Sequence, residues 1–495
     1  MNTDTNQEPI QDQGVIYGLD DKPPVGRALI LAIQHVLTMF GATVAVPLML
    51  GPEGDDGSGM GMDRAQVATL ISSVMLCSGI ATLIQATFGS RLPIIQGVSF
   101  SFLAAFAAII ATVKAQGGSP AEMMQYIAGA ILVGAAIEMT IGFSGLVGML
   151  RRALSPVVIG PVIMLIGLAL YGVGAPMAGT NWPISILTIA MVIVFSYVLS
   201  ARSRIFRLFP ILLAILISFG ICALLTVTKL VDSASAVYVH TDQIQAASMF
   251  RTDPSEIFLP WGPPKFHIGF IFAVLAGYLA SMIESFGDYH ACSQMAGGGD
   301  LTPKQLSRGI GCEGLGCAIT GFLGGFSSTS YSENVGLIGL TKVGSRFVVQ
   351  IAAVILILLG LLGKFGAAAA SIPTPIVGGL YCALFGLISA VGIKEFTKAD
   401  LNVDRNLFIG GFALFMGLSV PAYFNSDAGA QLLDQIGSLS WLGESGKSEQ
   451  VKSFATGLRD VVAAIGKTGM AVAAIIGLVL DNTLPATAKE RGLDV

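Results

Sequence analysis

Runs of apolar residues long enough to cross a lipid bilayer recur along almost the whole chain. A membrane-spanning helix needs about 20 predominantly apolar residues, and runs of this length begin at residue 28. We expect about fourteen such segments, near residues 28–50, 65–88, 94–113, 124–149, 155–176, 183–200, 207–230, 267–290, 306–325, 333–345, 346–370, 374–393, 404–422 and 462–481. Only 12% of the 495 residues are charged, against about 25% in soluble domains. The sequence therefore predicts an all-α integral membrane protein embedded in lipid.

Lysine and arginine are distributed unevenly between the loops that join these segments. The polar tail at residues 1–26 has no apolar core of a cleaved signal, so we place it in the cytoplasm. The cytoplasmic loops then contain Arg91, Arg151, Arg152, Arg202, Arg204, Arg207, Lys304, Arg308, Lys342, Arg346, Lys394, Lys398 and Arg405. The short outside loops contain only Arg64, Lys114 and Lys364, as the positive-inside rule requires. Both termini are predicted to be cytoplasmic, in a multi-pass protein of the plasma membrane (the inner membrane of a bacterium).

The predicted segments divide into two halves. Seven segments lie in residues 27–230, and seven more lie in residues 267–482, followed by a cytoplasmic tail at residues 483–495. A polar loop at 231–266, expected outside the membrane, separates the halves, and a second polar loop covers 423–461. Because each half has an odd number of segments, the halves start from opposite sides and any repeat is inverted. Inverted repeats are typical of secondary transporters.

The third segment of each half is interrupted by helix breakers and polar residues. In the first half the interruption is Leu92–Phe100, with the sequence LPIIQGVSF; in the second it is Gly324–Gly336, with the sequence GGFSSTSYSENVG. Non-helical backbone at this depth is tolerated only inside the protein or around a cavity. We expect each interruption to start a half-helix whose N-terminal amides point into a shared site, as in transporters with discontinuous helices.

The eighth segment carries two acidic residues four positions apart. Glu284 and Asp288 share one helix face. A charge in the bilayer core is costly unless it is paired or solvated, so such residues mark functional cavities. The alternative is a shifted register that places the pair at the cytoplasmic rim.

A third carboxylate, Glu333, lies at the predicted start of the second half-helix. It could cap that helix, or it could join Glu284 in binding a ligand with N–H donors while half-helix amides meet the ligand's carbonyl oxygens. Phe100, at the first interruption, could stack on a flat ring, although a Phe in a membrane segment is usually part of the core. His35, early in the first segment, could relay a proton or could bond another helix as a structural histidine.

Other sequence patterns argue against catalytic and cofactor sites. Gly309–Gly314 fits the dinucleotide-binding pattern G-x-G-x-x-G, but no strand precedes it and it opens a membrane helix. There is no zinc motif, nucleophile elbow or phosphate loop, and no basic tract of the kind that binds nucleic acid. We expect no cofactor, no metal, no nucleic-acid partner and no enzymatic activity.

Four ordered motifs resemble the nucleobase–ascorbate transporter family. Glu333–Lys342 resembles the family signature, in which Gln, Glu or Pro precedes Asn-x-Gly; its matching positions here are Asn334, Gly336, Thr341 and Lys342. Gln34–Pro47 resembles the family's first helix and Glu284–Tyr289 its eighth. Asp481–Pro485, followed by Glu490–Gly492, resembles its closing segment. The resemblance covers about residues 28–492 and all four motifs occur in the family's order.

This resemblance implies a fold and a mechanism. It implies fourteen helices in a seven-plus-seven inverted repeat, with segments 1–4 and 8–11 in a core domain and segments 5–7 and 12–14 in a gate domain. Transport would be elevator-like, driven by protons or less often by sodium, in a homodimer. The matching positions make Glu284, Glu333 and Phe100 the residues that bind the base, and Ser99, Asp288, Ser332 and Phe385 further pocket residues. Coupling would involve Glu284, Asp288 and His35, and Gln34 belongs to the first-helix motif.

The substrate is left open by these motifs. Uracil permeases resemble this chain at Glu333 but carry His in place of Asp288. Xanthine and urate permeases share Glu284 and Asp288 but usually carry Gln in place of Glu333, and ascorbate carriers tend to carry Pro there. We expect an oxopurine such as xanthine or urate, with uracil next. The alternatives are a sodium-coupled nucleobase or ascorbate carrier, or an anion transporter of the same fold.

Overall fold

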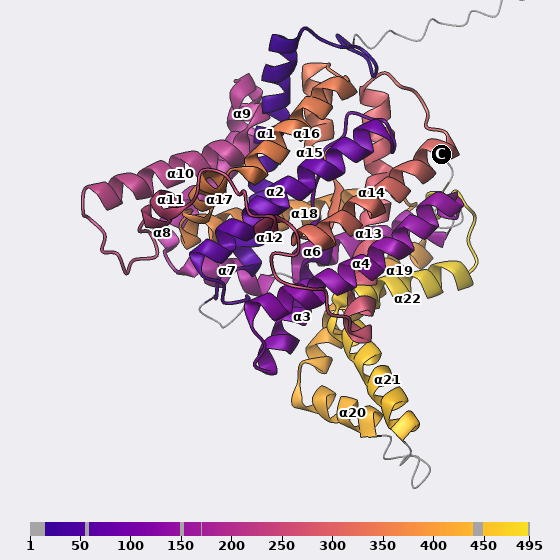
Figure 1. Cartoon of the computed structure of the whole chain (residues 1–495). Helices are drawn as coiled ribbons and strands as arrows, with labels where there is room; N and C mark the ends of the chain where they lie inside the picture. The colour runs from indigo at the N-terminus through magenta and orange to yellow at the C-terminus, as the bar shows by residue number, and fades with distance from the viewer. Residues whose placement is uncertain (1–14, 55–58, 149–152, 170, 439–448, 494–495) are drawn as a thin grey trace, which may run out of the picture.

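The computed structural model describes residues 15–54, 59–148, 153–169, 171–438 and 449–493, and these form an almost entirely helical body (Figure 1). Before the loop at 231–266 the helices are α1 (Val25–Leu50), α2 (Arg64–Thr87), α3 (Leu103–Ala115), α4 (Pro120–Ser144), α6 (Pro156–Ala169), α7 (Tyr171–Gly179), α8 (Trp182–Ile193), α9 (Arg204–Leu208) and α10 (Pro210–Val227). Three short helical turns, η1 (Phe100–Phe102), η2 (Val194–Val198) and η3 (Leu199–Ala201), extend α3 and α8. The predicted cytoplasmic residues Arg151 and Arg152 lie outside the described residues.

The second half of the chain repeats this helical character. The loop holds α11 (Asp242–Ala246) and α12 (Pro254–Ile257). It is followed by α13 (Ile268–Met295), α14 (Pro303–Leu323), α15 (Ser332–Thr341), α16 (Arg346–Leu361), α17 (Gly363–Ala370), α18 (Thr374–Phe396), α19 (Asp404–Phe424), α20 (Asp427–Ser438), α21 (Glu449–Lys467) and α22 (Gly469–Thr483). The only strands in the described part of the chain are β1 (Gln96–Val98) and β2 (Ser328–Ser330).

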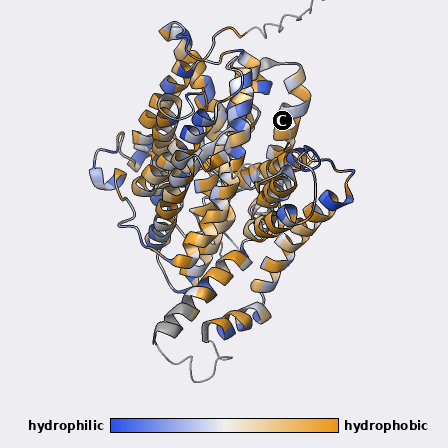
Figure 2. Ribbon diagram, turned by 90° about the vertical axis from the view of Figure 1, so that its right-hand side faces the viewer, coloured by the Kyte–Doolittle hydropathy of each residue, from blue (hydrophilic) through white to orange (hydrophobic). Residues whose placement is uncertain are grey.

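Helices suited to crossing a membrane make up most of this body. Within the described residues, 8 helices are long and apolar enough to span a bilayer, or up to 10 if two bent pairs each count as one span. Each predicted segment overlaps at least one helix, so the all-α membrane class is confirmed, while the number of fourteen spans stays a prediction. Large apolar side chains such as Leu224, Val227 and Phe415 are more than 60% exposed. Such exposure is expected where lipid, and not water, covers the surface, and Figure 2 shows hydrophobic residues along most of the long helices.

Two predicted segments and one predicted loop differ from the structure in shape. The segment at 155–176 is divided between α6 and α7, and the segment at 346–370 is bent by 80° between α16 and α17. The predicted polar loop at 423–461 instead contains two helices, α20 and α21, which Figure 1 shows projecting from the body. Their apolar residues occupy one helix face among polar ones, so a search for continuous apolar runs overlooks them.

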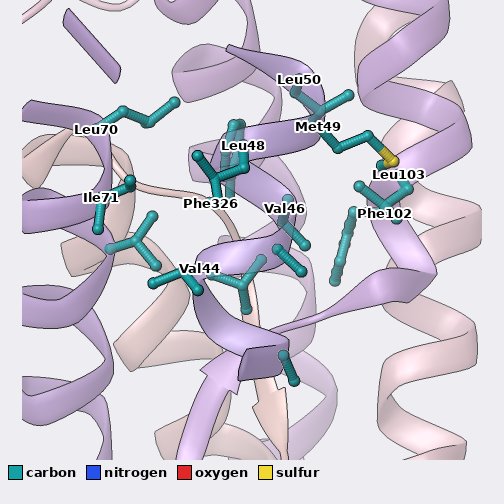
Figure 3. Packing of buried hydrophobic residues seen from close by; sticks show 14 of the residues in the cluster. Val44, Val46, Leu48, Met49, Leu50, Leu70, Ile71, Phe102, Leu103 and Phe326 are labelled. Carbon is teal, nitrogen blue, oxygen red and sulfur yellow. The ribbon is translucent and has the colours of Figure 1, made fainter. Parts of the chain in front are cut away.

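The main hydrophobic core lies where the first two helices meet the two interruptions. Val44, Val46 and Leu48 of α1 pack with Leu70 and Ile71 of α2. Figure 3 shows them beside Phe102, Leu103 and Phe326, which flank the strands. All eight side chains are no more than 6% exposed. This packing fixes the interrupted segments in the interior of the helical body.

Candidate substrate site

The two interrupted segments meet as a two-stranded antiparallel sheet. Gln96 pairs with Ser330, Gly97 with Thr329 and Val98 with Ser328. Two further backbone bonds extend the pairing, from Ser99 N to Ser327 O at 3.0 Å and from Tyr331 N to Ile95 O at 3.0 Å. The predicted interruptions are confirmed: each break leads into a helix, α3 or α15. Because each strand satisfies the other's backbone groups, neither break leaves them unpaired in a low-dielectric interior.

Side chains lock this small sheet in place. Gln96 donates through Nε2 to Ser330 Oγ at 2.8 Å, and Tyr331 donates through its hydroxyl to Val98 O at 2.8 Å. Gly97 is required by this contact, since a Cβ there would lie 2.4 Å from Tyr331 Cζ. The half-helices that follow the strands therefore start from a rigid base.

The acidic residues of α13 lie beside the start of α15. Ser332 donates to Asp288 Oδ1 at 2.7 Å, which joins the two helices directly. Asp288 is 8% exposed and Glu284 is half-buried. Asp288 and Glu333 are the two strongest charges acting on Glu284, so the three carboxylates belong to one electrostatic site. The structure thus brings together the acidic residues that the sequence singled out.

One face of α15 is open beside these carboxylates. Ser332, Glu333 and Gly336 are all exposed, and the first two share a helix face with Gly336 because they lie four and three positions before it. A Cβ added to Gly336 would meet nothing within 4 Å. Ser332 and Glu333 are the first two residues of the helix, where backbone amides have no carbonyl partner within the helix. The N-cap residue is Tyr331, so Glu333 itself is inside the first turn and does not occupy the capping position.

His35 and Asn334 connect α1 to the same half-helix. Asn334 Nδ2 donates to His35 O at 3.0 Å and lies 3.1 Å from His35 Nδ1. His35 is 3% exposed. This contact agrees with the alternative that His35 is a structural histidine bonding another helix. A role in proton relay stays a prediction. Gln34, the neighbouring motif residue, has a buried Oε1 with no protein partner among the described residues.

The remaining predicted pocket residues occupy different environments. Ser99 is fully buried, and its Oγ accepts from Ser101 N at 3.2 Å, so it caps the turn that starts at Phe100. Phe100 is partly buried between two apolar clusters. Phe385, on α18, is 6% exposed and its ring stacks on Tyr381 at 5.4 Å. Ser99 therefore makes a capping hydrogen bond, and Phe385 makes a packing contact.

The end of the signature motif is explained by local structure. Thr341 donates through Oγ1 to Leu337 O at 2.8 Å. Lys342 adopts a left-handed conformation with φ of 58° and ends α15. Its carbonyl accepts from Ile16 N at 2.8 Å, which ties the N-terminal tail to this helix end. These two motif residues shape the helix end.

Sequence reasoning missed a fourth carboxylate, Glu313, in the stretch that was set aside as a false dinucleotide motif. Glu313 is 1% exposed and accepts hydrogen bonds from five hydroxyl groups, those of Ser281, Ser285, Tyr289, Thr329 and Ser330, at 2.7–3.4 Å. The signal was present, because an acidic residue within a predicted membrane segment marks a functional site by default.

A separate cavity lies between the ends of several helices and the loop at 231–266. Its volume is about 510 Å³, and Met49, Arg64, Met177, Tyr238, His240 and Val377 are among the residues that line it. None of the acidic residues described above lines it. The candidate site is therefore the region where α13, α15 and the two strands meet.

Comparisons with known proteins place the chain in a family. Residues 26–426 match the family model Xan_ur_permease, described as a permease family. The chain is 35% identical over 98% of its length to solute carrier family 23 member 2 of Rattus norvegicus, covering 76% of that protein. It is 34% identical over 97% of its length to solute carrier family 23 member 1 of Mus musculus, covering 82%. It is 37% identical over 84% of its length to nucleobase-ascorbate transporter 1 of Arabidopsis thaliana, covering 81%.

A solved structure supports the fold alone. The transmembrane domain of BicA, a cyanobacterium bicarbonate transporter, aligns with a TM-score of 0.50 at 12% identity, over 90% of this chain and 96% of that one. Together, the family match over most of the chain and the relatives above 30% identity show that this protein belongs to the permease family of membrane transporters that includes solute carrier family 23 and the nucleobase-ascorbate transporters.

Proposed function

We propose that this protein is a secondary transporter that imports a nucleobase, either an oxopurine such as xanthine or urate, or uracil, together with protons. The observation that carries the proposal is the Ser332–Asp288 hydrogen bond, which holds the acidic face of α13 against the start of α15. It sets three carboxylates beside the free amides of a half-helix.

The chemistry of this site suits a neutral ring with both donors and acceptors. Ionised carboxylates only accept hydrogen bonds, and Glu284 and Glu333 would accept them from ring N–H groups. The first-turn amides of α15 would donate to ring carbonyl oxygens. The open face at Gly336 leaves room for a flat ligand beside Glu333, and partly buried Phe100 would supply an aromatic face.

Coupling to protons follows from the charge of the site. Glu284, Asp288 and Glu333 repel one another when all three are ionised, so a proton or a cation bound among them would lower the energy of the loaded state. We assign proton binding to Glu284 and Asp288, with His35 as a further candidate. An elevator-like movement of a core domain against a gate domain, in a homodimer of inverted repeats, completes the proposal.

Two other functions are compatible with part of this site or fold. A sodium-coupled nucleobase or ascorbate carrier would use the same acidic cluster, and it is favoured only if uptake needs sodium. An anion transporter has support from the BicA fold match, but a site with three carboxylates disfavours a negatively charged substrate.

The test is uptake of radiolabelled xanthine, urate, uracil and ascorbate by cells that produce the protein, with and without a protonophore. Saturable nucleobase uptake that collapses with the proton gradient is the expected result. Uptake that resists the protonophore but requires sodium would overturn the coupling, and no uptake of any base by correctly inserted protein would overturn the function.

A matched pair of variants tests the site itself. Glu284→Gln should abolish coupled uptake, whereas Glu122→Gln, at a partly exposed residue of α4 paired with Lys265 at 2.6 Å, should leave it intact. Accumulation at the wild-type level by Glu284→Gln would remove that residue from the mechanism.

A further inference from the structure

A fifth buried carboxylate, Glu138, lies in the middle of α4. It is 1% exposed, and neither of its side-chain oxygens has a hydrogen-bond partner among the described residues. Glu138 lies within the predicted segment 124–149, where an acidic residue marks a functional site by default, but the sequence analysis did not select it, and it is not among the residues assigned to the substrate site. A buried polar atom without a partner costs free energy, so it requires an explanation.

The glycines on either side of Glu138 fix its surroundings. Gly134 and Gly142 lie four positions before and after it, on the same helix face. A Cβ on Gly134 would lie 2.1 Å from the ring of Tyr278 on α13, and a Cβ on Gly142 would lie 2.2 Å from Gly311 N on α14. Glu138 therefore faces the junction of α4, α13 and α14.

Glu313 lies in the same junction. A Cβ on its neighbour Gly314 would lie 2.9 Å from Met139 N, so this turn of α14 is next to Glu138 in α4. The charged group that acts on Glu138 is Glu313, another carboxylate. The other titratable groups that interact with Glu138 are Tyr278 and Tyr289 on α13 and Cys317 on α14, none of which supplies a positive charge.

The two carboxylates have opposite hydrogen-bonding situations. Five hydroxyl donors satisfy Glu313, and donors stabilise a carboxylate in its ionised form. In the described part of the chain Glu138 has no hydrogen-bond donor and no ion-pair partner, and an isolated ionised carboxylate in an apolar interior costs many kcal/mol. The arrangement is stable if the pair carries one proton.

From this geometry we infer that Glu138 and Glu313 form a buried proton-binding pair, in which Glu138 holds the proton and Glu313 is the ionised partner. The pair lies on α4 and α14, whereas Glu284, Asp288 and Glu333 lie on α13 and α15; the two groups are linked because Glu313 acts electrostatically on Glu284 and Asp288. Ser285, which donates to Glu313 at 2.7 Å, follows Glu284 in α13, and Thr329 and Ser330 belong to β2, just before Ser332. A role in coupling rests on the proposed transport function; proton binding by the pair does not.

Infrared spectroscopy of the purified, substrate-free protein tests the pair without any assumption about the substrate. A protonated carboxyl group has a C=O stretch that an ionised carboxylate lacks. At neutral pH, Glu138→Gln should remove the band of one buried protonated carboxyl, and the control Glu122→Gln on the same helix should keep it. An unchanged band in Glu138→Gln would overturn the inference.

Stability supplies a second readout. Gln is neutral and nearly the same shape as a protonated Glu, so Glu138→Gln should fold and melt close to the wild-type temperature. Glu313→Gln replaces an oxygen that accepts hydrogen bonds with an NH₂ donor, so it should melt at a clearly lower temperature. Loss of stability or of folding in Glu138→Gln to the extent seen in Glu313→Gln would mean that Glu138 is ionised.

Sodium is the competing occupant of this oxygen-rich junction. The infrared measurement should therefore be repeated with sodium replaced by choline. The protonated-carboxyl band should be the same in both salts. A band that appears only without sodium would show that the pair binds sodium and would overturn the proton assignment. A protein that transports no base but passes these tests would contradict the proposed function and leave the pair standing.

Discussion

Asp481, near the C-terminal end of α22, is the centre of a buried ion cluster, and replacing it with Asn gives a quantitative test of the fold. Its side chain is fully buried and accepts from Arg405 Nη1 at 2.9 Å and from Arg491 Nη2 at 2.7 Å. Ser155, just before α6, donates to Oδ2 at 2.7 Å. One carboxylate thus joins α6, α19, α22 and the C-terminal tail.

The expected loss follows from what the substitution leaves behind. The Arg405 and Arg491 side chains are only 12% and 16% exposed, so both guanidinium groups would remain largely buried after losing the charge of Asp481. Breaking a buried ion pair by removing one partner costs about 3–5 kcal/mol. Asn keeps one oxygen acceptor, so we expect the lower end, about 3 kcal/mol. For a chain of 495 residues, an unfolding entropy of about 2.1 cal/mol/K per residue gives a shift of roughly 1 °C per kcal/mol, so the melting temperature should fall by about 3 °C.

The assay is thermal unfolding of the purified protein in detergent, followed by the loss of monodisperse protein on a sizing column. Arg491→Gln should cause a similar loss, and the double variant should lose less than the sum of the two single variants, because each removes the same interaction. A fall of less than 2 °C for Asp481→Asn, or additive losses in the double variant, would refute the reasoning.

Three further predictions concern the open face of α15, the contacts of Arg251 in the loop at 231–266, and the contact between the N-terminal tail and Gly344. Gly336→Leu should reduce uptake at least about tenfold without changing the melting temperature, because its side chain would enter open space beside Glu333; a stability loss would mean that Gly336 is packed. Arg251→Met should cost about 2–3 kcal/mol, since its guanidinium donates to Ser73 Oγ at 3.2 Å and to Gly360 O and Glu256 O. In Arg251→Met, limited proteolysis within 231–266 should become faster. An unchanged cleavage rate would mean that Arg251 does not hold this loop against the helices. A chain lacking residues 1–21 should melt below one lacking residues 1–14, because Gly344 N donates to Tyr17 O at 2.7 Å; equal melting temperatures would show that the tail contact adds no stability.

The sequence was sufficient to locate the long apolar helices and the two interruptions. The run that includes Gln96–Val98 and the run that includes Ser328–Ser330 combined helix breakers with polar residues, and both became strands followed by helices. The acidic residues Glu284 and Asp288 stood out because a charge is rare within an apolar segment. These features are local, so they can be read without knowing which segments touch.

The sequence analysis failed for residues whose role depends on partners distant in the chain. Glu313 lies in a stretch that matched a soluble motif, and only its hydroxyl partners on α13 and β2 distinguish it. Glu138 carries no motif at all, and its isolation is visible only from the packing of three helices. The helices α20 and α21 were read as a loop because their apolar residues are not consecutive.

The sequence by itself determined the membrane class, the helical segments and the positions at which helices break, because hydrophobic length and helix-breaking residues act over short stretches of chain. The tertiary structure decided which groups meet. Gln96 bonds Ser330 across 234 positions of the chain, and Asn334 reaches His35 across 299. Such contacts depend on how whole helices pack against one another, and no local pattern encodes that packing. The candidate substrate site and the proposed proton-binding pair both arise from this long-range pairing.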